Sequence, residues 1–173
     1  MEAAQPNTAF HPALAPHQAG RAGGPALLLA CGNSLRRDDG VGLRIAEAAE
    51  HLFPAARLRI VAAQQFTPEM AADLAETELA IFVDACTGDE PGAIRVVSVA
   101  AREEAAETHR LGPPALLAMA QTLCGHAPAR AFVLTIGAGC FGYGEDISGP
   151  LRRAVPRALR LLTNLVSAFS PQA

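Results

Sequence analysis

Short apolar runs alternate along this chain with segments whose apolar residues recur at helical spacing. Five runs are predicted strands: Leu27–Cys31, Leu58–Ala62, Leu79–Val83, Ile94–Val99 and Ala131–Ile136. Four segments are predicted helices: Val41–Leu52, Pro68–Glu76, Pro113–Cys124 and Pro150–Phe169. This alternation predicts an α/β fold, with helices on both faces of a mixed, mostly parallel sheet.

Two of the predicted strands follow one another directly. Leu79–Val83 and Ile94–Val99 are joined without a helix, through the turn residues Gly88–Gly92. Strands joined by a short turn pair antiparallel, whereas parallel neighbours need a longer crossover connection. These two strands are therefore expected to form the antiparallel pair of the sheet.

Length and composition restrict the class of protein. The 173 residues are half apolar and suit one domain with a substantial core. The formal net charge is −3, and the 14 basic residues are all arginines without a basic run, which argues against nucleic-acid binding. The longest apolar run is far shorter than the roughly 20 residues of a membrane span, so no membrane partner is expected.

The predicted α/β domain spans residues 26–169. Residues 1–25 are a tail rich in Ala, Pro and Gly that lacks the apolar stretch of a signal peptide, and residues 170–173 are a short C-terminal tail. We therefore expect a cytoplasmic protein. Nothing in the pattern requires more than a monomer.

Two familiar motifs are excluded by their context. Cys31, Cys86, Cys124 and Cys140 include no CxxC pair, so neither a zinc ribbon nor a thioredoxin motif is indicated. The segment Gly137–Gly142 reads G-x-G-x-x-G after a predicted strand, but it does not open a helix and no strand follows it. A nucleotide-binding domain therefore lacks support.

Carboxylates and a histidine adjoin the predicted strands and helices at loop positions. Asp38 and Asp39 follow the first strand, Asp84 ends the third strand, and His109 precedes the third helix. In the predicted sheet, Asp39, Asp84 and His109 are expected to converge at one end. Two carboxylates and one imidazole would suit nickel, zinc, iron or manganese, and would leave coordination positions open for an external group.

The same residues also suit purely structural roles. Asp38 and Asp39 precede a helix, and an aspartate at that position commonly caps the free N–H groups. Asp84 suits a turn after a strand, and a single loop histidine such as His109 is commonly solvated. Spacing alone leaves the metal-site and structural interpretations open.

Four segments together resemble the hydrogenase maturation endopeptidases, which process the C-terminus of the large subunit of nickel–iron hydrogenases. They are Gly32–Gly42 (GNSLRRDDGVG), Phe82–Ala85 (FVDA), Thr108–Leu111 (THRL) and Gly142–Ser148 (GYGEDIS). The first motif is fairly specific, and the others gain weight from their order and spacing across residues 26–169. The resemblance implies a three-layer α/β/α sandwich with a five-stranded, mostly parallel sheet.

The resemblance also implies a site and a reaction. Asp39, Asp84 and His109 fall on the metal-contacting positions of the family, of which the first is Glu or Asp. The implied metal is nickel carried by the immature hydrogenase large subunit, the expected partner, rather than a permanently bound cofactor. Asp38 or Asp39 is the implied catalytic carboxylate that assists attack on the scissile carbonyl. Further residues expected to bind substrate are Asn33, Thr67 and Glu69.

One segment departs from the family pattern. Many members carry an Asp-Gly-(Gly/Cys)-Thr-like box after the second strand, whereas this chain has Gln64–Glu69 (QQFTPE). This QQFTPE pattern resembles that of the family branch that serves cytoplasmic, multisubunit hydrogenases.

Two alternatives to the peptidase remain open. One is a self-sufficient metallohydrolase that holds zinc or manganese permanently, and the other is a noncatalytic nickel-dependent checkpoint or chaperone.

Overall fold

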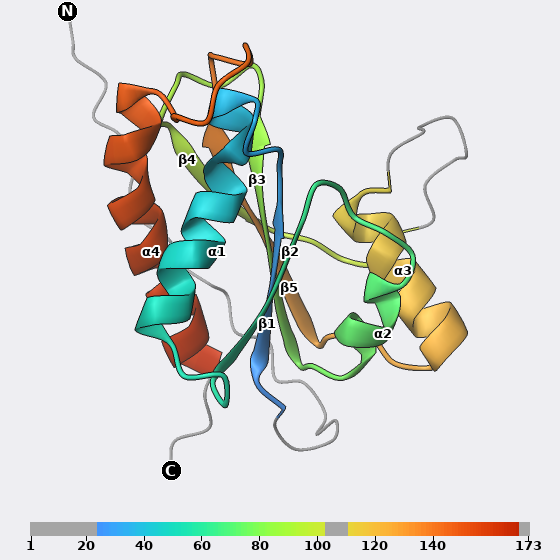
Figure 1. Ribbon diagram of the computed structural model, residues 1–173. Helices are drawn as coiled ribbons and strands as arrows, with labels where there is room; N and C mark the ends of the chain where they lie inside the picture. Colours follow the sequence, from blue (N-terminus) through green and yellow to red (C-terminus); the bar gives the residue numbers. More distant parts are fainter. Residues whose placement is uncertain (1–23, 103–110, 170–173) are drawn as a thin grey trace, which may run out of the picture.

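A five-stranded sheet with helices on both faces forms the centre of the protein in the computed structural model, which describes residues 24–102 and 111–169 (Figure 1). The strands are β1 (Ala26–Cys31), β2 (Leu58–Ala63), β3 (Leu79–Cys86), β4 (Ile94–Ser98) and β5 (Arg130–Gly137). The helices are a 3-10 turn η1 (Arg37–Gly40), α1 (Val41–Leu52), α2 (Met70–Ala75), α3 (Pro113–Cys124) and α4 (Gly149–Phe169). Helices α1 and α4 cover one face and α2 and α3 the other, which confirms the predicted α/β/α class.

The strand order in the sheet is β2-β1-β3-β5-β4. Strands β2, β1, β3 and β5 run parallel, and β4 is antiparallel to β5, with Ile94 opposite Ile136. The expected antiparallel strand is therefore present, but the prediction that it pairs with the preceding strand is wrong. Both sides of β3 are occupied by β1 and β5, so β4 joins the sheet at the outer side of β5.

The two central strands have apolar side chains buried on both faces. Leu28 and Ile81 pack against α1 and α4, and Leu27 and Phe82 pack against α2 and α3. All four side chains are fully buried, and each contributes about 1.5–3 kcal/mol through its removal from water. Such burial on both faces explains why these strands are continuous apolar runs rather than alternating ones.

Close backbone packing fixes the connection from β1 to α1. A Cβ atom at Gly42 would lie 2.2 Å from the carbonyl oxygen of Cys31 and 3.1 Å from that of Val83. A Cβ at Gly32, where φ is +147°, would lie 2.0 Å from the carbonyl oxygen of Asp39. Both positions therefore require glycine, and both hold the loop that carries Asp39 against the ends of the central strands.

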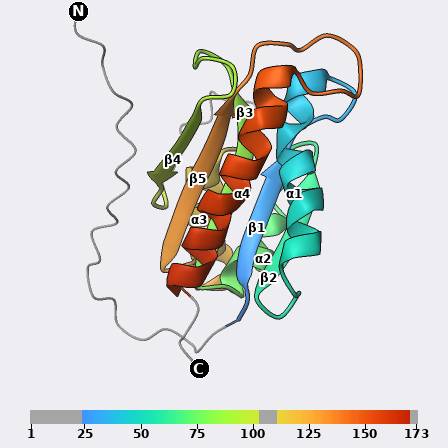
Figure 2. The same ribbon diagram turned by 90° about the vertical axis from the view of Figure 1, so that its left-hand side faces the viewer.

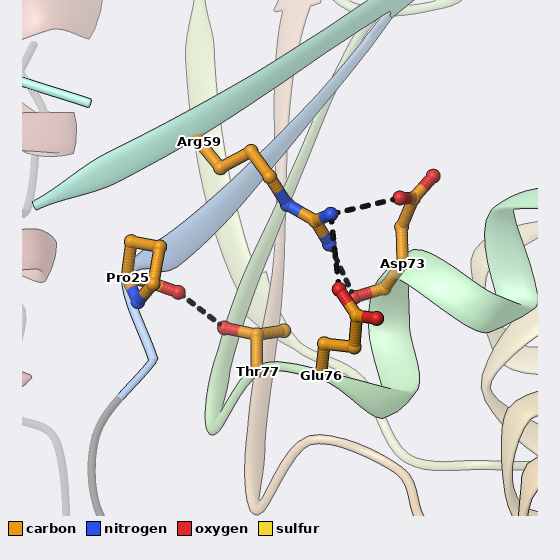
Figure 3. Close-up of polar contacts among 5 residues, drawn as sticks. All are labelled: Pro25, Arg59, Asp73, Glu76 and Thr77. Carbon is orange, nitrogen blue, oxygen red and sulfur yellow. Dashed lines mark hydrogen bonds and ion pairs between the residues drawn. The ribbon is translucent and has the colours of Figure 1, made fainter. Parts of the chain in front are cut away.

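Polar contacts hold α2 at the opposite, amino-terminal end of the parallel strands (Figure 3). The guanidinium group of Arg59 in β2 forms an ion pair of 3.0 Å with Asp73 and another of 3.3 Å with Glu76. The hydroxyl group of Thr77 donates a 2.7 Å hydrogen bond to the carbonyl oxygen of Pro25, just before β1. These contacts fix the helix that follows the Gln64–Glu69 segment.

Among the described residues, none of the helices combines the length and apolar character needed to cross a membrane.

Candidate active site

A cavity of about 400 Å³ opens at the carboxyl ends of β1 and β3. The chain leaves β1 toward β2 on one side and returns to β3 on the other, so this is the point where the strand order reverses. Open α/β sheets bind ligands at such a point. The residues that line the cavity are Cys31, Gly32, Asp39, Gln64, Gln65, Phe66, Pro68, Asp84, Leu111, Gly112 and Pro113.

Two of the predicted site carboxylates, Asp39 and Asp84, line this same cavity. Asp39 lies in η1, where its N–H donates a 3.2 Å hydrogen bond to the carbonyl oxygen of Arg36. Asp84 lies within β3 and not after its end, because the strand continues to Cys86. Both residues are half-buried, so their carboxylates are partly withdrawn from water yet reachable through the cavity.

The alternative to a site role was a helix cap for Asp39 and a turn position for Asp84. Helix α1 begins after Gly40, and no side-chain hydrogen bond caps that position in the described structure. An oxygen of the Asp84 carboxylate accepts a 2.8 Å hydrogen bond from the N–H of Ala85, the next residue of β3. This contact orients Asp84 and is compatible with a role in the cavity.

Asp38, the other predicted catalytic carboxylate, has different surroundings from its neighbour. Its side chain is fully buried, and it is not among the described residues that line the cavity. Its oxygens accept hydrogen bonds from the N–H groups of Gly139 (3.1 Å), Cys140 (2.9 Å) and Ser148 (2.7 Å). The hydroxyl group of Ser148 donates a fourth bond of 3.1 Å. Asp38 therefore links η1 to the segment between β5 and α4.

These hydrogen bonds determine the charge state of Asp38. Burial alone would raise the pKa of this carboxyl, but the N–H and hydroxyl donors of Ser148, with the N–H groups of Gly139 and Cys140, lower the pKa below its ordinary value. The carboxylate is thus held ionised, with each oxygen already hydrogen-bonded. Such a group is a poor proton acceptor for catalysis.

The backbone strengthens the same link between the two loops, which lie together at the top of Figure 1. The N–H of Arg37 donates a 2.8 Å bond to the carbonyl oxygen of Gly144, and the N–H of Gly144 donates a 3.0 Å bond to that of Leu35. Arg37 has a positive φ of 48°, which is uncommon for a residue with a side chain. The loop that carries Asp39 is therefore held from two directions.

The three predicted substrate-binding residues do not line the cavity within the described structure. The side-chain oxygen of Asn33 accepts a 2.9 Å bond from the N–H of Leu35 and so shapes the loop before η1. A hydrogen bond from the Thr67 side chain lowers the pKa of the Glu69 carboxyl, which is exposed. Their role in substrate binding stays a prediction.

Sequence reasoning missed several cavity residues that neighbour the predicted ones. The thiol of Cys31 donates a 3.3 Å hydrogen bond to the carbonyl oxygen of Gln64. The ring of Phe66 packs edge-on against the buried ring of Phe82, with 5.5 Å between ring centroids. The end of the first strand and the Gln64–Glu69 segment were singled out from the sequence. Residue type alone, however, did not indicate which of their residues line the cavity.

His109 lies outside the described residues, so its predicted contact with a metal stays a prediction. The nearby residues Leu111, Gly112 and Pro113 line the cavity. Within residues 24–102 and 111–169, no group of three or more His, Cys, Asp or Glu side chains is placed to hold a metal ion. The described part of the site therefore offers the two carboxylates of Asp39 and Asp84.

Several solved structures similar to this chain are named hydrogenase maturation proteases or peptidases. The chain is similar to the hydrogenase maturating endopeptidase HybD from E. coli, with a TM-score of 0.67 and 20% identity over 84% of this chain and 94% of that one. It is also similar to the [NiFe] hydrogenase maturation protease HycI from Thermococcus kodakarensis KOD1, with a TM-score of 0.64 and 22% identity over 83% and 92% of the two chains. A hydrogenase 2 maturation peptidase from Thaumarchaeota archaeon SCGC_AB-539-E09 has a TM-score of 0.62 and 22% identity over 83% and 98%.

These similarities show that the chain has the fold of the hydrogenase maturation proteases over nearly their whole length. The sequence itself matches no protein-family model and no curated protein. The shared fold agrees with the sequence motifs that resemble the same family.

Proposed function

We propose that this protein is a cytoplasmic endopeptidase that removes a C-terminal peptide from the nickel-loaded precursor of a nickel–iron hydrogenase large subunit. One observation carries the proposal: Asp39 and Asp84 line a single cavity at the switch point of a fold shared with hydrogenase maturation proteases. The family-like motifs of the sequence support the same substrate. The enzyme would act as a monomer on this protein partner.

The cavity suits a site that engages a metal brought by the substrate. Carboxylate oxygens bind divalent cations such as nickel, and two protein carboxylates leave positions for the ligands that the substrate supplies. We assign Asp39 and Asp84 to this contact, with His109 as the third proposed ligand. Nickel is then part of the substrate, and it selects precursors that have already been loaded.

Asp39 is the better candidate of the two adjacent carboxylates for assisting peptide hydrolysis. It reaches the cavity, whereas both oxygens of Asp38 accept hydrogen bonds from residues of the 139–148 segment. A carboxylate beside the scissile bond accepts a proton from the attacking water, and positioning of both groups removes the cost of a chance encounter. We therefore propose Asp39 as the catalytic base and Asp38 as the residue that fixes its loop.

The cavity walls suit an extended peptide. Phe66, Leu111 and Pro113 supply apolar surface, and Gln64 and Gln65 supply amide groups beside the two carboxylates. Binding pockets commonly combine an apolar lining with a few polar groups that fix orientation. The segment of the precursor that contains the scissile bond would lie along these cavity residues, with the scissile carbonyl group near Asp39.

The proposal is tested by incubating the purified protein with a nickel-loaded immature large subunit and measuring the intact mass of that subunit. We expect the wild type to remove a C-terminal peptide, and Asp39→Asn and Asp84→Asn to slow cleavage at least about 100-fold. Asp73→Asn is the matched control, because Asp73 pairs with Arg59 at the other end of the sheet. Wild-type rates for both cavity variants would refute the assignment.

A further inference from the structure

Helix α4 carries an unusual concentration of positive charge. Four of the 14 arginines of the chain lie on it, and the helix contains no acidic residue. They are Arg152, Arg153, Arg157 and Arg160, and all four are exposed. Their spacing places them on the solvent side of a helix whose other side is buried against the sheet, as Figure 2 shows for α4.

These four charges are uncompensated within the described residues. No ion pair joins any of them to a carboxylate in residues 24–102 and 111–169. Elsewhere in the described structure, Arg44, Arg59 and Arg95 each form an ion pair with a nearby Asp or Glu. Since the whole chain has a net charge of −3, α4 is a local basic face on an otherwise acidic protein.

Two of the arginines border a second depression, separate from the cavity that contains Asp39. This α4–β4 groove has a volume of about 410 Å³ and is lined by Ile94, Arg157, Arg160, Leu161, Thr163 and Asn164. Its lining combines two guanidinium groups, two apolar side chains and two uncharged polar groups. The groove therefore offers partners for both carboxylates and apolar side chains.

The sheet edge beside the groove adds main-chain hydrogen-bonding groups. Strand β4 is the last strand of the sheet, and it pairs with β5 on one side only in the described structure. Figure 2 shows β4 at the margin of the sheet beside β5. The free edge of such a strand offers N–H and C=O groups to which an extended peptide can add as a further strand.

We propose that the α4–β4 groove binds an extended acidic polypeptide segment that carries an apolar side chain. The apolar side chain packs between Ile94 and Leu161, carboxylates pair with Arg157 and Arg160, and the peptide backbone adds to β4. Guanidinium groups pair with carboxylates in a bidentate manner, which makes arginine well suited to this role. The inference concerns binding alone and does not depend on the proposed peptidase activity.

The groove fits a polypeptide better than a nucleic acid. Nucleic-acid binding depends on Lys and Arg side chains that neutralise several phosphates along a backbone, whereas this groove presents two arginines. Its apolar side chains Ile94 and Leu161 have no counterpart in a phosphate backbone. The overall negative charge of the chain also opposes the approach of a polyanion.

Fluorescence anisotropy with the full chain tests this inference. The probe is a labelled Glu–Val peptide of eight residues, Glu-Ser-Val-Ser-Glu-Ser-Val-Ser, in which Glu and Val share one face of the extended strand. The comparison probes are a Lys–Val peptide, with Lys in place of each Glu, and a single-stranded oligonucleotide. We expect the Glu–Val peptide alone to bind, with affinity that falls as salt is raised from 50 to 200 mM. Hydrogen exchange of the amide groups of β4 should slow in the complex.

Matched variants locate the binding site. We expect Arg157→Ala/Arg160→Ala to weaken binding at least about tenfold, which corresponds to loss of charge-assisted contacts. Arg152→Ala/Arg153→Ala removes the same charge from the same helix but outside the groove lining, and should weaken binding less than about threefold. Equal effects of the two variants, absence of peptide binding, equal binding of the Lys–Val peptide or tighter binding of the oligonucleotide would overturn the proposal.

Discussion

Asp38 and Asp39 are neighbours in the chain, yet their side chains have separate tasks. Successive side chains of a 3-10 helix point in different directions, because such a helix has about three residues per turn. In η1 this places Asp38 against the 139–148 segment and Asp39 in the cavity. The pair thus combines an internal anchor with a carboxylate that lines the cavity, on one short turn.

The anchor role of Asp38 predicts a large effect on stability. Asp38→Ala leaves three N–H donors without an acceptor, and such unsatisfied buried groups cost about 1–3 kcal/mol each when water cannot replace the partner. We expect the free energy of unfolding, measured with urea, to fall by about 3 kcal/mol. Asp73→Ala is the control, because the Arg59–Asp73 ion pair is partly exposed to water and Arg59 keeps Glu76 as a partner, so we expect a loss of less than about 1 kcal/mol. Equal effects would show that Asp38 is not an anchor.

The lowered pKa of Asp38 predicts how this stabilisation depends on pH. An unfolded aspartate titrates near about 3.9, and the pKa of Asp38 in the folded protein is lower. The ionised carboxylate therefore stabilises the fold above about pH 4, and this contribution is lost as pH falls through the folded-state pKa. The stability difference between wild type and Asp38→Asn should stay constant from about pH 7 to 5 and shrink below about 4. A difference that grows on acidification would contradict this assignment.

The sequence was sufficient to place Asp39 and Asp84 in one cavity, because both adjoin the ends of parallel strands that are predictable from apolar runs. It was not sufficient to predict the partners of Asp38. Those donors lie 101 to 110 residues away, and the hydrogen bonds exist only after the loops at the end of the sheet meet. Local residue types carry no signal for a contact of that kind.

At the scale of secondary-structure elements, the approach of α1 to the central strands determines where Asp39 lies. Gly42→Ala would place a methyl group 2.2 Å from the carbonyl oxygen of Cys31, so α1 would have to move. We expect a loss of at least about 2 kcal/mol in the free energy of unfolding, and slower precursor cleavage. Gly142→Ala is the matched control, because no atom lies within 4 Å of the added Cβ; it should change stability by less than about 0.5 kcal/mol. A tolerated Gly42→Ala would show that this contact is not restrictive.

Most helices and strands were predictable because their apolar periodicity is strong. Helices α1 and α3 have the predicted bounds, whereas β3 extends three residues beyond the predicted strand, to Cys86. The pairing of β4 was not predictable from its short connection to β3. That choice depends on competition among all strands for the two sides of β3, which β1 and β5 occupy.

At the scale of the whole molecule, the strand order creates a cavity at the carboxyl ends of β1 and β3, and it leaves β4 at the far edge beside α4. The candidate active site and the proposed peptide-binding groove are therefore distinct surfaces. Arg157→Ala/Arg160→Ala should therefore leave the rate of precursor cleavage at saturating substrate unchanged. Asp39→Asn should leave the affinity of the groove for the Glu–Val peptide unchanged.

The cavity is proposed to act on a nickel-loaded precursor. The most direct measurement compares the intact mass of a cognate immature large subunit, with and without nickel, after incubation with the purified protein. We expect loss of a C-terminal peptide from the nickel-loaded subunit and an unchanged mass for the nickel-free subunit. An unchanged mass for the nickel-loaded subunit, despite a demonstrated complex, would contradict the peptidase and favour a noncatalytic checkpoint.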